Sequence, residues 1–166
     1  MADKQRRLAA IMFTDLVGYS AMTQENEALA LELLEEHRAI LRPFFPKRGG
    51  LEIKTIGDAF LVEFASAVEA VECAVEIQKA LLERNEKNPA DRPIRLRIGI
   101  HVGDILRDGD DVLGDGVNIA SRLEPLADPG GICISEQVYF QVRKQVQEEF
   151  ISLGKKTLKN IQEPLG

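Results

Sequence analysis

The chain has 166 residues, of which 45% are hydrophobic and 29% are charged. This balance is typical of one globular domain and excludes a disordered or fibrous protein. Lys and Arg total 21 against 27 Asp and Glu, a formal net charge of −6, which argues against nucleic acid as a partner because phosphate binding needs a basic surface. No apolar run approaches the roughly 20 residues that cross a bilayer, and the charged start lacks a cleavable signal pattern. We therefore treat residues 1–166 as a single domain without a membrane segment and expect it to be cytoplasmic.

The first half of the chain predicts a strand, a long helix and a hairpin. Residues 8–13 form a nearly continuous apolar run, which is typical of a buried central strand. A segment rich in Leu, Ala and Glu predicts one helix over 20–45, ended by two prolines. Residues 51–55 and 59–64 follow as two strands, joined by a tight Gly-Asp turn.

A capping box and an alternating strand come next. Ser66 and Glu69 have the spacing that opens a helix. Residues 94–102 then alternate, with apolar side chains on one face and Arg95, Arg97, Gly99, His101 and Gly103 following on the other. We expect helices to cover the apolar face, and the polar face with its bare backbone to stay open for a partner.

The remaining elements are short. The order strand, helix, two strands, helix, strand predicts an α+β fold with a ferredoxin-like (palm-like) core, a mostly antiparallel sheet, helices on one face, and extra C-terminal strands and helix. The chain still reads as a strand at its last residues, so we expect it to be trimmed from a longer protein. The later segments are a loop at 107–116, a helix at 117–126, a strand at 132–134, a helix at 136–143, and strands near 150–153 and 157–161.

The cysteines and histidines carry no motif. Cys73 and Cys133 lie 60 positions apart in apolar segments, and we interpret them as small hydrophobic residues in a reducing compartment. His37 and His101 pair with no Cys or Ser motif. We expect both histidines to be structural.

Two aspartates follow predicted strands. Asp15 comes just after the first apolar strand, and Asp58 lies in the glycine turn. An Asp at such a junction is commonly a helix cap or a turn residue. Two of them on adjacent central strands could instead hold a pair of Mg²⁺ or Mn²⁺ ions, which prefer oxygen ligands.

Two further pairs of polar residues are candidates for binding a ligand. Asn118 and Arg122 are four residues apart on one predicted helix face, which is either a solvated face or a pair of donors aimed at charge developing on a phosphoryl group. Lys54 and Asp111 offer a donor and an acceptor that complement the edge of adenine and would refuse guanine. Sequence spacing alone does not pair Lys54 with Asp111.

Taken together, four stretches in this order resemble the catalytic domain of class III adenylate cyclases. The resemblance covers almost the whole chain, and the match of four separate motifs makes it specific. The four are FTDLVGYS at 13–20, KTIGD at 54–58, RIGIHVG at 97–103, and DVLG at 111–114 running on to VNIASR at 117–122.

The resemblance implies a role for each matching position. Asp15 and Asp58 would carry two divalent metal ions, Mg²⁺ or Mn²⁺, with the Leu16 carbonyl as a backbone ligand. Lys54 and Asp111 would recognise adenine.

The same resemblance implies how ribose and phosphates are held. Asn118 would orient the ribose and Arg122 would stabilise the pentavalent transition state. The phosphate contacts would come from Arg97, Lys159 and the backbone amides of Gly18, Tyr19 and Ser20.

The implied activity is conversion of ATP to 3′,5′-cyclic AMP and pyrophosphate by two-metal-ion, in-line attack of the ribose 3′-hydroxyl on the α-phosphate. The family also implies a head-to-tail homodimer, in which the metal aspartates come from one protomer and Lys54, Asp111, Asn118 and Arg122 from its partner. Two alternatives stay open. One is a guanylate cyclase, and the other is a non-catalytic domain of the same fold that senses nucleotide or dimerises.

Overall fold

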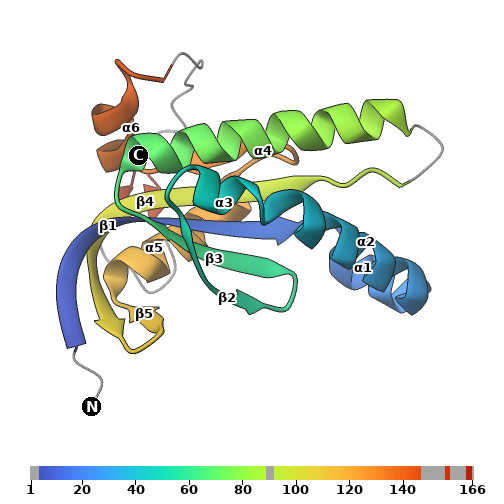
Figure 1. The fold of residues 1–166 in the computed structure, drawn as a ribbon, viewed down its shortest axis with the longest axis horizontal. Helices are drawn as coiled ribbons and strands as arrows, with labels where there is room; N and C mark the ends of the chain where they lie inside the picture. Colours follow the sequence, from blue (N-terminus) through green and yellow to red (C-terminus); the bar gives the residue numbers. More distant parts are fainter. Residues whose placement is uncertain (1–3, 89–91, 147–155, 158–163, 166) are drawn as a thin grey trace.

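The computed structural model describes residues 4–88, 92–146, 156–157 and 164–165. Within these residues the main sheet has the strand order β2-β3-β1-β4-β5, and β6 pairs with β4 (Figure 1). Its strands are β1 Lys4–Leu16, β2 Leu51–Ile56, β3 Ala59–Phe64, β4 Leu96–Asp108, β5 Asp111–Leu113 and β6 Ile132–Ile134. The helices are α1 Tyr19–Glu25, α2 Glu27–Leu41, α3 Phe44–Lys47, α4 Ala67–Lys87, α5 Asp115–Leu123, the 3-10 turn η1 Glu124–Leu126 and α6 Glu136–Val142.

The expected ferredoxin-like core is confirmed. β1, β2, β3 and β4 occupy the order β2-β3-β1-β4, all antiparallel, with helices in the two crossovers. β6 is the exception, because it runs parallel to β4. A separate pair of short strands, β7 Lys156–Thr157 and β8 Pro164–Leu165, lies near the C-terminus. The strand expected near 150–153 and most of the one expected at 157–161 lie outside the described residues.

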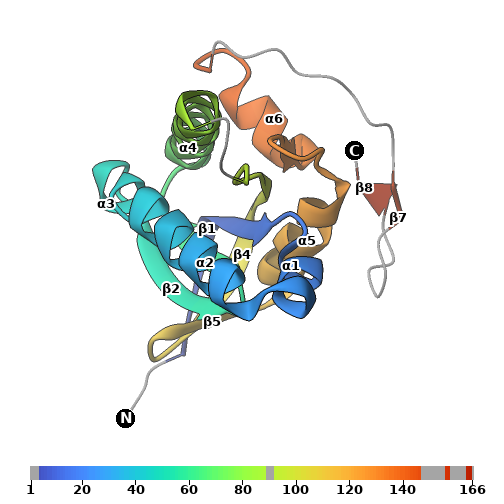
Figure 2. The same cartoon turned by 90° about the vertical axis from the view of Figure 1, so that its right-hand side faces the viewer.

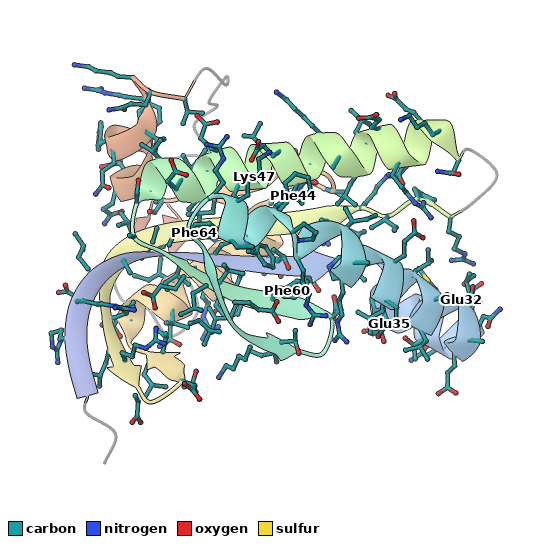
Figure 3. All side chains as sticks on the ribbon, in the orientation of Figure 1. Glu32, Glu35, Phe44, Lys47, Phe60 and Phe64 are labelled. Atoms are coloured by element: carbon teal, nitrogen blue, oxygen red, sulfur yellow. The ribbon has the colours of Figure 1, made fainter. Side chains whose placement is uncertain are left out.

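The main core lies between the sheet and the layer formed by α2, α3, α4 and α6. Phe60 and Phe64 of β3 are fully buried in it, beneath α3 and α4 (Figure 3). Phe45 of α3 meets the ring of Phe60 edge to face, with 5.2 Å between centroids. Ala10 and Met12 of β1 point into the same core, which accounts for every second residue of the first apolar run.

The expectation of an open second face is wrong around Gly99. Helix α5 packs against this face, on the opposite side of β1 and β4 from α2 and α4 (Figure 2). There, Ile11 and Phe13 of β1 share a second, smaller core with Ala120. β1 is therefore buried on both faces, and this is why its sequence is apolar without alternation.

The helix expected over 20–45 is three helices. Asn26 has extended backbone, with φ −156°, and its side chain accepts a hydrogen bond from Leu29 N at 3.1 Å. This cap starts α2, while the Asn26 backbone N–H closes α1 by donating to Met22 O. The composition favoured helix throughout, but a side chain that competes for backbone groups ends one helix and begins the next.

The predicted capping box is confirmed in part. Ser66 accepts hydrogen bonds from Val68 N and Glu69 N at the start of α4.

The prediction of a loop over 107–116 is wrong. β4 continues to Asp108 and turns into β5 as a hairpin. Gly109 at the turn has φ 62°, a conformation that glycine adopts without strain.

Both cysteines are free and buried, and burial raises the pKa of Cys73 to about 12. Both histidines are buried as well. His101 Nδ1 lies 2.8 Å from Ser135 Oγ, whereas His37 Nδ1 lies 3.3 Å from Leu34 O and its Nε2 has no hydrogen-bond partner. Within the described residues, no helix has both the length and the hydropathy needed to cross a membrane.

Replacing His37 with Leu is expected to make the protein less sensitive to acid. Burial lowers the pKa of His37 from 6.5 to about 4, so the unfolded chain binds more protons between these values and stability is lost as the pH falls through them. The difference in unfolding free energy between His37→Leu and the wild type should grow by about 3 kcal/mol from pH 7 to pH 4. Urea unfolding at several pH values measures this difference, and a pH-independent difference would contradict it.

Candidate functional site

A polar cavity of about 170 Å³ lies at the end of β1. It combines residues of the stretch 13–20, the hairpin turn and one basic residue of β4. Its lining residues are Asp15, Leu16, Gly18, Tyr19, Ser20, Ala21, Asp58 and Arg97.

The two aspartates meet because their elements are adjacent in the sheet. Asp15 is near the end of β1, and Asp58 lies in the turn between β2 and β3, beside β1. Leu16 N donates to Asp58 Oδ2 at 2.8 Å, and Asp15 and Asp58 line the same cavity. The structure thus brings together the two carboxylates that the sequence placed on neighbouring strands.

This pair is electrostatically crowded. Burial is the main cause that raises the pKa of Asp15 to about 8, followed by the hydrogen bond with Asp58 and the negative charges of Glu124 and Asp58. The positive charge of Arg97 acts in the opposite direction. A divalent cation would relieve this crowding by favouring the ionised carboxylates.

Glu124 is a site residue that the sequence analysis missed. It follows α5 at the start of η1, and its negative charge is one of the causes that raise the pKa of Asp15. Burial is the main cause that raises the pKa of Glu124 to about 7. One signal was present: an acidic residue at the C-terminal end of a helix opposes the helix dipole, so Glu124 is better explained by a tertiary contact than by helix capping.

Arg97 is held beside Asp15. The two residues are partners in the β1–β4 register, which places them across from each other on the two central strands. Arg97 Nε also donates to Ala127 O at 3.1 Å. The guanidinium is therefore tied both to the sheet and to the segment that follows α5.

Gly99 allows this segment to approach the sheet. A Cβ atom at Gly99 would lie 2.4 Å from Glu124 N and 2.7 Å from Ala120 O, closer than any real contact. The backbone around Glu124 can reach the strand only because residue 99 has no side chain.

Gly99→Ala is therefore expected to displace the end of α5 and to lower the unfolding free energy by about 1–3 kcal/mol, as overpacking does. Gly131→Ala is the matched comparison, because its Cβ would meet Asp128 O at a milder 3.0 Å. Denaturant unfolding of both variants measures the effect. Equal stability of Gly99→Ala and the wild type would contradict the close approach.

The turn between β1 and α1 also lines the cavity. Gly18 has φ 77° and precedes α1, whose first residues are Tyr19 and Ser20. Val17 N donates to Arg95 O at 2.9 Å, so the turn is fixed to the residue that precedes β4. The three positions assigned to phosphate contacts therefore lie beside Asp15 and Asp58.

In the structure Lys54 contacts Asp111, a pairing that sequence spacing alone did not predict. Lys54 Nζ lies 3.1 Å from the Asp111 carboxylate, and each side chain is 42% exposed. The Val112 backbone N–H also donates to Asp111. This hydrogen bond and the one from Lys54 hold the pKa of Asp111 below its usual value.

A β-bulge aims Lys54 at this partner. The register of β2 and β3 passes from Glu52 opposite Val62 to Lys54 opposite Leu61, so Ile53 is extra. Without the bulge, Lys54 would lie opposite Phe60 and point toward the helical layer. With it, Lys54 shares the face of Leu61, the face of the smaller core.

The remaining assigned residues do not join the aspartates. Asn118 and Arg122 lie on α5, where Asn118 is exposed and Arg122 is half-buried. As far as the described residues extend, neither of them lines the cavity of Asp15 and Asp58, and nor does Lys54 or Asp111. Lys159 lies outside the described residues. Lys54, Asp111, Asn118 and Arg122 therefore lie outside the described lining of the aspartate cavity.

The chemistry of the cavity suits a hard cation that has further ligands of its own. Two carboxylates and the Leu16 carbonyl are oxygen donors of the kind that Mg²⁺ and Mn²⁺ prefer. Within the part of the chain that the structure describes, no group of three or more His, Cys, Asp or Glu side chains is placed to hold a metal ion. Bound ions would need oxygens from a ligand such as a triphosphate.

Comparisons with known proteins identify the family of this chain. The family model for the adenylate and guanylate cyclase catalytic domain matches residues 1–164. A protein of Rhizobium meliloti (strain 1021), provisionally named adenylate cyclase 3, is 43% identical over 162 residues, which are 97% of this chain and 28% of that protein. The chain thus spans less than a third of this relative.

Solved structures share the fold. The crystal structure of an adenylate/guanylate cyclase/hydrolase from Silicibacter pomeroyi superposes with a TM-score of 0.92 at 40% identity, over 98% of this chain and 95% of that one. The adenylyl cyclase CyaB from P. aeruginosa superposes with a TM-score of 0.87 at 25% identity, over 98% and 93%. The resemblance of the four motifs is confirmed: the chain belongs to the family of adenylate and guanylate cyclase catalytic domains.

Proposed function

We propose that this chain converts ATP to 3′,5′-cyclic AMP and pyrophosphate. The observation that carries the proposal is the pairing of Lys54 with Asp111 on one face of the sheet, together with the two linked aspartates at the end of β1. The first pair fits adenine, and the second suits a metal-bound triphosphate.

Adenine would take the place of the contact between Lys54 and Asp111. Lys54 would donate to the ring nitrogen N1, and Asp111 would accept from the exocyclic amine. Because this ion pair is exposed, it contributes at most about 1 kcal/mol and is easily exchanged for a ligand. Guanine presents the reverse pattern, which would leave both groups without partners.

Asp15, Asp58 and the Leu16 carbonyl would hold two divalent ions. When bound, Mg²⁺ or Mn²⁺ supplies the charge that activates the ribose 3′-hydroxyl and neutralises the triphosphate. Arg97, Lys159 and the amides of Gly18, Tyr19 and Ser20 would bind the phosphate oxygens.

Asn118 and Arg122 would act on the reacting groups. The bond that forms joins the ribose O3′ to the α-phosphorus, and the bond that breaks releases pyrophosphate. Asn118 would orient the ribose for this in-line attack. Arg122 would donate to the α-phosphoryl oxygens as negative charge grows on them.

We propose that these two groups of residues meet across a head-to-tail homodimer. The support is that Lys54, Asp111, Asn118 and Arg122 are absent from the lining of the described cavity of their own chain. In a two-fold dimer each chain would complete the site of the other. An isolated chain is then expected to be inactive. We propose the cytoplasm as the compartment of the dimer.

The reaction is tested by incubating the protein with Mn²⁺ and either ATP or GTP and then measuring cyclic nucleotide and pyrophosphate. Cyclic AMP is the expected main product. Cyclic GMP as the main product would overturn the adenine assignment in favour of a guanylate cyclase. No product from either nucleotide, at concentrations where the protein dimerises, would favour a non-catalytic binding domain.

The shared site is tested by mixing Asp15→Ala with Arg122→Ala. Each variant alone is expected to be inactive. Random exchange puts half of the chains into mixed dimers with one intact site, so about a quarter of wild-type activity should return. If the variants dimerise and mixing restores nothing, the composite site is wrong.

A further inference from the structure

Two consecutive residues of β2 have their side chains on the same face of the sheet. In a regular strand, neighbouring side chains point to opposite faces, but a bulge sets two residues opposite one. The register passes directly from the pair at Glu52 to the pair of Lys54 and Leu61. Ile53 is the extra residue, and it packs against the smaller core that contains Leu61. The bulge thus places an apolar side chain and a cation next to each other on one face.

The same core anchors the strand that carries Asp111. β2 and β5 are the two ends of the strand order, yet they contact each other, so the sheet curls around the smaller core (Figure 2). Ile53 on β2 and Val112 on β5, which is 1% exposed, both pack there. Ile53 directly precedes Lys54, and Val112 directly follows Asp111. Each member of the polar pair therefore has an apolar neighbour anchored in one shared core.

These anchors matter most when adenine binds. The ion pair between Lys54 and Asp111 is exposed and holds the two side chains only weakly, and adenine would replace it. Asp111 keeps a second contact, the hydrogen bond from Val112 N at 2.8 Å. Lys54 has a long, flexible stem, so the position of its amine depends on the backbone of the bulge. Ile53 is a β2 side chain that ties this bulge to the core.

We propose that Ile53 is a positioning residue for purine specificity: anchored in the smaller core, it fixes the bulge that presents the Lys54 amine to adenine beside Asp111. The inference deepens the proposed function and rests on it, because it assumes that Lys54 and Asp111 bind the base. Ile53 acts through Lys54 rather than on the reacting groups. The preference for adenine then depends on a packed isoleucine as well as on the two polar residues.

The test compares kcat/KM for ATP with kcat/KM for GTP, measured with Mn²⁺ on the intact chain. Ile53→Ala removes the anchor and keeps Lys54. Its preference for ATP over GTP is expected to fall about 10-fold, the contribution of one hydrogen bond from a charged donor. The fall should come from a higher KM for ATP with kcat nearly unchanged, because the base is bound equally in the ground state and the transition state. Ile53→Val keeps a branched apolar side chain and should keep most of the preference.

Ile132→Ala is the matched control. Ile132 is also a half-buried isoleucine on a strand, but it packs against the main core, so its truncation removes the same atoms away from the bulge. Its preference for ATP should equal that of the wild type, even where its melting temperature falls as much as that of Ile53→Ala. A similar loss of preference in both variants would overturn the proposal, because lower stability alone would then explain it.

A Lys54→Ala background separates positioning from packing. Lys54→Ala by itself is expected to lose most of the preference for ATP. Adding Ile53→Ala should change the preference no further, since no amine remains to be placed. A further fall as large as the one that Ile53→Ala causes in the wild type would overturn the action through Lys54.

Two results have different meanings. If the wild type prefers ATP and Lys54→Ala loses this preference, but Ile53→Ala keeps it in full, the role of Ile53 is overturned and the adenine assignment stands. If Lys54→Ala keeps the preference of the wild type, the adenine assignment of the proposed function is itself overturned.

Discussion

Asp58→Asn is expected to lower kcat/KM for cyclic AMP formation by at least about 10²–10³-fold, the loss typical of a group that stabilises transition-state charge. Asn keeps an oxygen that can accept the hydrogen bond from Leu16 N, so the turn should keep its shape. What is lost is one of the two carboxylate charges. Steady-state assays with ATP and Mn²⁺ measure the effect.

Two observations accompany this variant. With the charge of Asp58 gone, the pKa of Asp15 should move back toward its ordinary value, because Asp58 is one of the groups that raise it. Asp104→Asn is the matched control, since Asp104 is an exposed acid on β4 and lies outside the cavity, and it should keep full activity. Wild-type activity of Asp58→Asn in Mn²⁺ would mean that this carboxylate does not hold the ions.

Arg122→Ala is expected to lower kcat by about 10²–10³-fold while KM for ATP changes only a few-fold. A donor that meets charge developing in the transition state contributes more there than in the ground state, so its removal affects turnover before binding. Ala120 and Leu123, its neighbours on α5, are buried, so the helix should stay packed without the arginine side chain.

The control for this variant is Arg143→Ala, because Arg143 is an exposed arginine at the end of α6. Its kinetics should match those of the wild type. A raised KM with unchanged kcat in Arg122→Ala would assign Arg122 to substrate binding alone. Residual activity also sets the background for the mixing experiment, since mixing must exceed the sum of the two variants.

Much of the fold could be predicted because the local patterns are strong. The apolar run before Asp15, the hairpin at Gly57 and the helix that begins at Ser66 all lie where the sequence places them. Apolar periodicity sets these elements, and the glycine turn and the helix cap set where they start and stop. The proximity of Asp15 and Asp58 follows from strand adjacency in the same way.

One error came from a contact between distant residues, and another came from a local helix cap. Nothing in the alternation around Gly99 indicated that α5 would cover it, because a missing side chain looks the same on an open face and on one where a backbone packs closely. The residues on both sides of Asn26 favour a helix, and only the extended backbone of Asn26 separates α1 from α2.

The sequence by itself determined the ferredoxin-like order of elements and the four motifs that resemble the cyclase family, since periodicity and motif spacing are local properties. The tertiary structure decided which residues meet. The bulge at Ile53 turns Lys54 toward Asp111, and the bare backbone of Gly99 lets the backbone of Glu124 approach β4. Each of these pairs joins segments far apart in the chain, and their contact depends on strand register and close packing, which local sequence does not specify.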